Sequence, residues 1–151
     1  MQDTKRERGS APTAALLSAV ADELRRLAAE AETAMVIRFG ELFLADATAE
    51  FFAERTPATV AALVMSAFRH MQRSAPDRAD VAVGAPEQEQ EPWSAPVTLI
   101  RAHATEAPFI VSTIREYLHE QHLSVERFLH PVLRVVRAGD GSVQSIGPAS
   151  A

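Results

Sequence analysis

The sequence predicts an α+β fold, in which a helical N-terminal segment precedes a smaller unit with an antiparallel sheet. Between residues 10 and 73, apolar residues recur at three- and four-residue steps, the period of amphipathic helices. After Pro76 the pattern changes to short runs rich in β-branched residues. Asp140-Gly141 separates two such runs, as in a β-hairpin. The length of 151 residues suits one domain of ordinary size, or one and a half small ones.

Three helices are expected in the first part of the chain. The first begins near Ser10–Pro12, behind a frayed tail, and continues for about five turns. The second extends from roughly Glu32 to Glu54, although Gly40 lowers its expected stability by about 1 kcal/mol relative to alanine. The third opens at Thr56-Pro57, where a capping hydroxyl precedes a proline in the first turn, and ends at Ser74–Pro76.

The rest of the chain is expected to combine strands with one helix. The expected elements are a strand at 79–83, a strand at 97–103, a helix from Pro108 to His122, a strand at 125–137 and a return strand from 143 to 146. Pro131 indicates an edge or a bulge in the long strand, because proline cannot donate to the ladder. Residues 84–96 are interpreted as a linker with a solvated acidic run, 87–91, and with Trp93 anchoring it on the sheet.

From residue 97 onward, the order β-α-β-β gives the first four elements of a ferredoxin-like β-α-β-β-α-β unit. Without the last helix and strand, half of one sheet face would be bare. We therefore expect the sequence to be the front piece of a longer protein. The expected divisions are a disordered tail at 1–11, a helical segment at 12–75, a strand and linker loop at 76–96, and the truncated unit at 97–151.

Composition excludes several classes of function. With 15 basic and 20 acidic residues the net charge is -5, which argues against nucleic acid as a partner. No apolar run approaches the roughly 18 to 20 residues of a membrane span, and no apolar region follows the basic start as in a secretory signal. The absence of cysteine excludes disulfides, thiolate zinc sites and cysteine nucleophiles. The cytoplasm is the simplest compartment.

No active site is recognisable in the sequence. His119 and His122 lie three apart on a helix and could share a ligand, but zincin spacing is four, so a solvated helix end is favoured. His103 and His130 are interpreted as half-buried residues whose rings bond neighbouring backbone groups. There is no Gly-x-Ser-x-Gly elbow and no glycine-rich phosphate loop. We predict no catalytic, cofactor-binding or metal-binding residue, and a binding or regulatory role.

One set of motifs in the second half of the chain has a distinctive order and spacing. Its residues are 97–100, 106–114, 123–125, 130–133, Arg137 and Asp140-Gly141. This set resembles the N-terminal part of the large NAD-specific glutamate dehydrogenases. Those proteins have a strand followed by an acidic turn and Pro-Phe-Leu-Val-Asp-Ser, a helix, a strand ending in His-Pro-Val, an arginine and an Asp-Gly turn. Ser112 and Thr113 replace the aspartate and serine of that pattern, and Ala107 replaces one of its acids.

The resemblance implies an ACT-like domain, a ferredoxin-like fold typical of amino-acid sensing and subunit contacts. It further implies a long parent chain that oxidatively deaminates L-glutamate to 2-oxoglutarate and ammonia with NAD. Catalytic and NAD-binding residues would then lie downstream, so NAD is a cofactor of the parent and not of this segment. The expected partners are the remainder of the parent chain, further subunits of a homo-oligomer and a small amino-acid effector.

One turn is the candidate effector or interface site. It comprises Thr105, Glu106, Ala107, Pro108 and Phe109. Amides at a helix N-terminus favour a carboxylate, so an amino-acid ligand is physically reasonable there. The competing interpretation is a simple helix cap. For the whole chain, two alternatives to a dehydrogenase segment stay open: a free-standing ACT-like module that binds an amino acid or a protein, and a helical protein in which residues 10–73 dock a partner.

Overall fold

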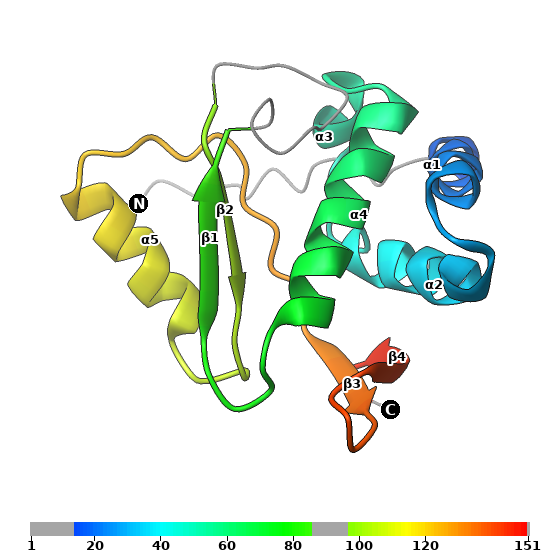
Figure 1. Cartoon of the computed structure of the whole chain (residues 1–151). Coiled ribbons are helices and arrows are strands. Elements are labelled where there is room, and N and C mark those ends of the chain that lie inside the picture. Colours follow the sequence, from blue (N-terminus) through cyan, green and yellow to red (C-terminus); the bar gives the residue numbers. More distant parts are fainter. Residues whose placement is uncertain (1–13, 86–96, 151) are drawn as a thin grey trace.

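A computed structural model describes residues 14–85 and 97–150 and has the expected mixed α+β class. Its elements are α1 (Ala14–Leu27), the 3-10 turn η1 (Glu30–Glu32), α2 (Thr33–Phe43), α3 (Ala49–Ala53), α4 (Pro57–Arg73), β1 (Asp80–Gly84), β2 (Leu99–His103), α5 (Ile110–Glu120), β3 (Leu133–Arg137) and β4 (Val143–Pro148). In Figure 1, α1, α2 and α4 lie together, β1 and β2 lie beyond α4, and α5 lies at the far end. The β3–β4 hairpin lies near the end of α4.

Helix α4 is the centre of the hydrophobic core. Its side chains Val60, Val64 and Phe68 are inaccessible to solvent. The ring of Phe68 meets Phe39 of α2 edge-on, with centroids 5.5 Å apart. Every buried residue in the described part of the chain lies between Val20 and Ser74. The core therefore belongs to the helical segment.

The start of α4 is as the sequence predicts. The side-chain oxygen of Thr56 accepts a hydrogen bond of 3.2 Å from the backbone N–H of Thr59, and Pro57 follows in the first turn. Proline there needs no donor, and its fixed φ suits the helix. At the other end, the Ser74 hydroxyl donates to the carbonyl of His70 at 2.7 Å. Both ends of α4 thus have side-chain partners.

The second predicted helix is wrong as a single element. α2 ends at Phe43, and residues 44–48 turn before the short α3. The turn buries Leu44 and Ala47, and it returns Phe51 and Phe52 to the core. Two shorter helices bury more of this segment's apolar residues than one straight helix could, because a straight helix of this length would carry Phe51 away from α4.

Gly40 lies inside α2 and does not break it. A Cβ at this position would be 3.0 Å from Cδ1 of Leu24 and 3.3 Å from Cγ1 of Val64. The glycine therefore allows α2 to approach both α1 and α4 closely. Its effect is on packing between helices and not on helix termination.

The strands form two separate antiparallel pairs. β1 pairs with β2, with Asp80 opposite His103 and Gly84 opposite Leu99. β3 pairs with β4 across the predicted hairpin, which is confirmed, and Gly141 there has a φ of 87°. The pairing is antiparallel as expected, but it is divided between a β1–β2 ribbon and a β3–β4 hairpin in place of one sheet.

The long strand predicted at 125–137 is wrong over most of its length. Only Leu133–Arg137 form β3, and Pro131 precedes the strand. Its partner β4 ends at Pro148, which lies opposite Leu133, so the ladder cannot extend further back. The preceding segment is held by side chains, among them the Arg127 guanidinium, which donates to the Glu54 carboxylate at 2.9 Å.

The predicted start of α5 is two residues early. The helix begins at Ile110, because Phe109 adopts a left-handed conformation with a φ of 64°. The predicted tail, the start of the first helix near Ser10, the acidic run 87–91 and Trp93 lie outside the described residues. Within residues 14–85 and 97–150, no helix combines the length and hydrophobicity needed to cross a membrane.

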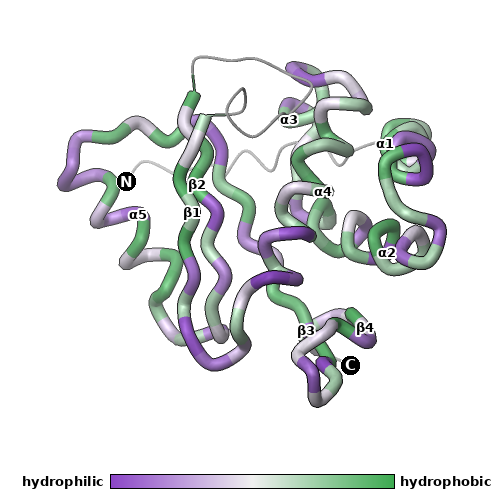
Figure 2. Tube along the Cα trace, viewed as in Figure 1, coloured by the Kyte–Doolittle hydropathy of each residue, from purple (hydrophilic) through white to green (hydrophobic). Residues whose placement is uncertain are grey.

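The hydrophobic side chains of the β3–β4 hairpin have different surroundings from those of the β1–β2 ribbon. In the β3–β4 hairpin, half-buried side chains pack against the helical core, and they are Leu133, Val135, Val143 and Ile146. The β1–β2 ribbon and α5 also carry hydrophobic stretches, as Figure 2 shows, but α5 has no buried residue. The hairpin thus contacts the helical segment. The division of the chain into a tail, a helical segment, a linker and a truncated unit stays a prediction.

Candidate functional site

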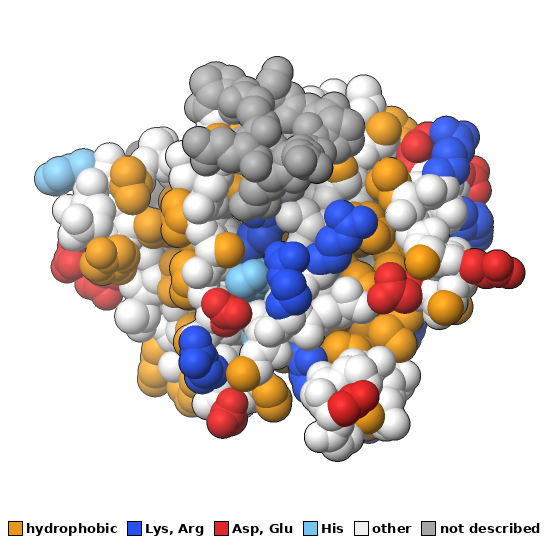
Figure 3. Space-filling model, in the orientation of Figure 1, with side chains coloured by type: hydrophobic (Ala, Val, Ile, Leu, Met, Phe, Trp, Pro, Cys, Tyr) orange, Lys and Arg blue, Asp and Glu red, His pale blue; other side chains and the backbone are white. Residues whose placement is uncertain are grey.

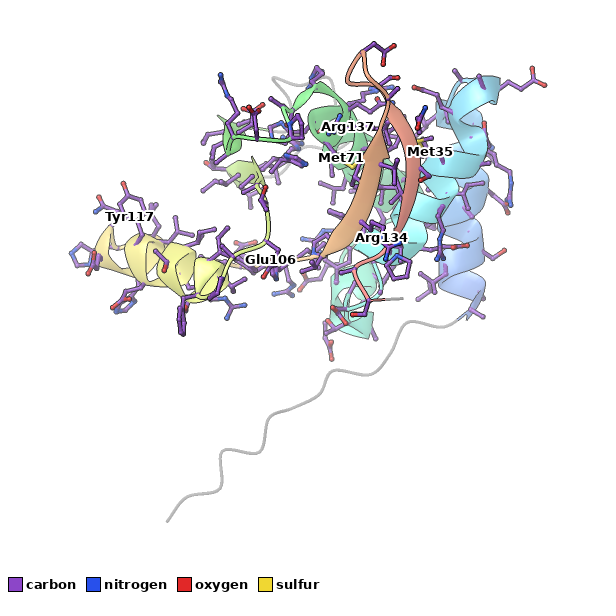
Figure 4. The ribbon with its side chains drawn as sticks, turned by 90° about the horizontal axis from the view of Figure 1, so that it is seen from below. Met35, Met71, Glu106, Tyr117, Arg134 and Arg137 are labelled. Atoms are coloured by element: carbon purple, nitrogen blue, oxygen red, sulfur yellow. The ribbon has the colours of Figure 1, made fainter. Side chains whose placement is uncertain are left out.

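The candidate turn Thr105–Phe109 connects β2 to α5 and is exposed throughout. Two side chains attach it to other parts of the chain. The hydroxyl of Thr105 donates to the carbonyl of Pro76 at 3.4 Å, a long bond. The Glu106 carboxylate lies 3.2 Å from Nε2 of His130, so it approaches the segment that leads to β3. Figure 4 shows Glu106 at the base of α5, between the helix and the body of the molecule.

The turn leads into a helix start that has no side-chain cap and in which Phe109 has a left-handed backbone. The backbone N–H of Ile110 donates to the carbonyl of Ala107 at 3.4 Å. The carbonyl of Phe109 accepts from the Thr113 N–H and from the Ser112 hydroxyl, each at 2.9 Å. Phe109 is 81% exposed. Its left-handed backbone is uncommon for a bulky residue.

The turn combines groups that attract an anion with a group that repels one. The first amides of α5 favour an anion. The Glu106 carboxylate lies in the same turn, and it repels an anion except where a protonated His130 offsets its charge. The assignment of Thr105, Glu106, Ala107, Pro108 and Phe109 as an effector or interface site stays a prediction.

A second cluster, which we call the polar joint, connects the helical core to both strand pairs. It consists of His70 and Ser74 at the end of α4, Asp80 of β1, His103 of β2 and Arg137 of β3. His70 and Ser74 are only 8% and 3% exposed, and they are the buried polar residues of the described chain. The Ser74 hydroxyl lies 3.2 Å from the Asp80 carboxylate, and Nε2 of His70 lies 3.3 Å from the Asp80 carbonyl.

Arg137 attaches the β3–β4 hairpin to this joint. Its guanidinium donates to the carbonyl of Met71 at 2.7 Å and to that of Gly141 at 3.0 Å. A third contact, to the carbonyl of Gln72, is 3.4 Å long. The last carbonyls of a helix lack partners within the helix and carry a partial negative charge, so a guanidinium suits them. Figure 4 shows Arg137 beside Met71.

His103 is half-buried in the joint, and its Nδ1 has no hydrogen-bond partner among the described residues. The sequence predicts a half-buried ring in which one nitrogen bonds a backbone group. The half-burial is confirmed, and Nδ1 is not the nitrogen that makes such a bond. Burial lowers the pKa of His103, the charges of Arg137 and His70 lower it further, and Asp80 partly opposes them. His103 is therefore held in its neutral form over a wider pH range than a free imidazole.

The remaining histidines have local roles. His130 is exposed, and it bonds the Glu106 carboxylate and not the backbone group that the sequence suggested. His119 and His122 lie at the end of α5, where the His122 N–H donates to the carbonyl of His119 at 2.9 Å. Within residues 14–85 and 97–150, no group of three or more His, Asp or Glu side chains is arranged to hold a metal ion.

Sequence analysis missed the polar joint as a unit. Its members come from four elements, and no spacing in the sequence relates them. Only Asp80 and His103 could have been paired in advance, by aligning the two predicted strands in an antiparallel register. His70 lies at the end of α4, and Nε2 of its ring approaches the Asp80 carbonyl, a contact that no sequence spacing predicts.

Comparisons with known proteins bear on identity. Residues 39–151 match the family described as "Glutamate dehydrogenase, ACT1 domain". A curated relative, the NAD-specific glutamate dehydrogenase of Pseudomonas aeruginosa, is 26% identical over 113 residues. The match covers 75% of this chain and 7% of the relative. No solved structure matches significantly. Because the family match extends over most of the chain, this protein belongs to the glutamate dehydrogenase ACT1-domain family.

Proposed function

We propose that this chain is the N-terminal regulatory and assembly segment of a large NAD-dependent glutamate dehydrogenase and carries no catalytic residue itself. The parent enzyme would convert L-glutamate, NAD⁺ and water to 2-oxoglutarate, ammonium and NADH, and it would act in the cytoplasm. The family match and the dehydrogenase relative support this proposal. The match covers 7% of the relative, so the chemistry would belong to the rest of such a protein.

The uneven distribution of buried residues is the structural observation that carries the proposal. All buried residues lie between Val20 and Ser74, although the described chain continues to residue 150. Of the eleven large hydrophobic side chains that are exposed among residues 14–85 and 97–150, nine lie between Val81 and Val136. A unit that functions alone rarely exposes large contiguous apolar patches. The described residues after Ser74 expose many large apolar side chains and bury none, which favours a segment that is completed by other protein.

The residues present do not fit NAD. A dinucleotide pyrophosphate needs a glycine-rich turn between a strand and a helix, where the backbone can approach it closely. Within the described residues, β2 and α5 form a strand–turn–helix unit, but its turn has no glycine, and Phe109 occupies the position before the helix. We therefore assign NAD to the parent enzyme outside this segment.

Regulation through the turn Thr105–Phe109 is a further part of the proposal. The turn is exposed and lies at the N-terminus of an 11-residue helix, so a small amino-acid effector could reach it. In the assembled enzyme, neighbouring subunits or the rest of the chain would complete the site. The charge of Glu106 favours a ligand that has an ammonium group as well as a carboxylate.

The experiment compares the full-length parent enzyme with a variant that lacks residues 1–151. We expect the full-length enzyme to form NADH in a glutamate-dependent manner. We expect the truncated enzyme to retain this chemistry per folded subunit but to lose its response to amino acids or its normal subunit assembly. A full-length protein that does not reduce NAD with glutamate contradicts the proposal. So does a truncated enzyme with unchanged assembly and unchanged response.

A further inference from the structure

The β1–β2 ribbon has one polar and one apolar face. Strand residues alternate in exposure, and the more buried set, which includes Asp80, Arg101 and His103, faces α4. The opposite set forms what we call the outer face, and it consists of Val81, Val83, Ile100 and Ala102. Val81 lies directly opposite Ala102, and Val83 lies directly opposite Ile100.

The outer face is exposed although it carries no charge. Val81 is 59% exposed, Val83 64% and Ile100 49%. In Figure 1, helix α5 and helix α4 lie on opposite sides of the ribbon, but α5 leaves these side chains accessible. Hydrophobic side chains are visible on the surface in this region in Figure 3. A contiguous apolar face of this kind normally marks a contact surface.

Within the described residues, the ribbon consists of only two strands, β1 and β2. Nε2 of His70 lies 3.3 Å from the Asp80 carbonyl at one end of the ribbon. A two-stranded ribbon is marginally stable alone and gains stability from a partner on its face or edge. The exposed apolar face of this two-stranded ribbon therefore points to a missing contact on that face.

We propose that the outer face of the β1–β2 ribbon is covered, in the parent enzyme, by an apolar surface from another part of the same polypeptide. This inference rests on the proposed function. Four aliphatic side chains expose far less than the roughly 800 Å² that each partner contributes to a standard interface between separate molecules. A tethered segment is at a high effective concentration and needs less area. The relative, in which the matched region is 7% of the length, shows that ample polypeptide exists in this family to supply it.

The test measures the accessibility of Val83 in the full-length enzyme. The segment has no cysteine, so Val83→Cys places one thiol on the outer face, and Leu27→Cys places one on α1 as a matched control. Leu27 is less exposed than Val83 in this structure. Labelling with a maleimide is followed by peptide mass spectrometry. We expect Val83→Cys to react at least about tenfold more slowly than Leu27→Cys, because a covering surface excludes the reagent.

Two outcomes overturn the inference. Equal or faster reaction of Val83→Cys means that the face is open in the enzyme. Disulfide-linked dimers of Val83→Cys, formed between two chains under mild oxidation, mean that a second copy covers the face. Glutamate-dependent NADH formation and the mass of the polypeptide are measured on the same preparations. A large, active enzyme with a reactive Val83→Cys defeats only this inference, whereas a 16.4 kDa native chain defeats the proposed function itself.

Discussion

At the scale of single residues, the polar joint brings the carbonyl groups at the end of α4, a guanidinium and a histidine ring close together. The end of α4 supplies carbonyl acceptors, and Arg137 supplies the cation that faces them. His103 lies near this cation without a partner for its Nδ1. Stability of the chain should therefore depend on the charge state of His103 and on the guanidinium of Arg137.

The first prediction concerns the pH dependence set by His103. Its pKa in the folded chain is lowered from the ordinary value of 6.5, by burial first and then by Arg137 and His70. The unfolded chain then binds the proton more readily, so the free energy of unfolding is highest above pH 6.5 and decreases as the pH falls toward the lowered pKa. Melting temperatures measured between pH 8 and pH 5 should show this decrease.

The variant His103→Gln should have a weaker pH dependence in the same range, because the variant side chain does not titrate. His119→Gln, on the exposed end of α5, serves as the control and should retain the dependence of the unsubstituted chain. Identical melting profiles for His103→Gln and the unsubstituted chain would contradict the assignment.

The second prediction concerns Arg137. Replacement by methionine keeps much of the apolar stem but removes the donors to Met71 and Gly141. We expect Arg137→Met to lower the free energy of unfolding by about 1–2 kcal/mol, since each charge-assisted bond in this partly solvated position counts for less than in a dry core. Urea unfolding measures the change. Arg134→Met, on the same strand but exposed, should change the free energy by less than about 0.5 kcal/mol.

At the scale of elements, α4 is the helix whose ends the sequence predicted best. Its start depends on local chemistry, a hydroxyl followed by a proline, which acts in the same way in any tertiary context. The third prediction follows from this. Thr56→Ala should lower the free energy of unfolding by about 1 kcal/mol, because the N–H of Thr59 loses its acceptor. Chemical unfolding monitored by circular dichroism provides the measurement.

Thr48→Ala is the matched control for the cap. Thr48 precedes α3, but its side chain accepts no capping bond from the helix. The substitution should therefore cost clearly less than Thr56→Ala. An equal or larger effect at Thr48 would mean that the cap does not explain the stability of α4.

The elements that the sequence did not predict are those that depend on distant contacts. Gly40 suggests helix weakness, yet the structure uses it for close packing against Leu24 and Val64, and the chain turns four residues later. Likewise, the sequence predicts a strand from residue 125 onward, but β3 can extend only as far as its partner β4. A local sequence pattern predicts an element well when packing against other elements does not decide where it begins and ends. The end of α2 and the length of β3 both depend on such packing.

The candidate turn could be predicted from the sequence, whereas the polar joint could not. The turn Thr105–Phe109 is continuous in sequence, so its position between a strand and a helix could be predicted. The joint brings together side chains up to 67 positions apart, from His70 to Arg137, and its existence depends on how four elements pack. Only the left-handed conformation of Phe109 was unexpected within the turn.

At the scale of the whole molecule, the helical segment has a buried hydrophobic core, whereas the described strands contain no buried residue. The β3–β4 hairpin packs on this core through half-buried side chains, while the β1–β2 ribbon and α5 leave hydrophobic surface accessible. This asymmetry agrees with the expectation, drawn from the element order alone, of an incomplete ferredoxin-like unit. Membership in the glutamate dehydrogenase ACT1-domain family gives a reason why such a unit would exist.

The measurement that tests the central claim most directly is the mass of the native polypeptide in its own cells. A denaturing blot with an antibody against residues 57–73 detects every chain that contains α4. The account predicts a band far above 16.4 kDa, with no more than a trace at that mass, because the segment would be the front of a large dehydrogenase. A single band at 16.4 kDa would contradict it, and the chain would then be a free-standing ACT-like module.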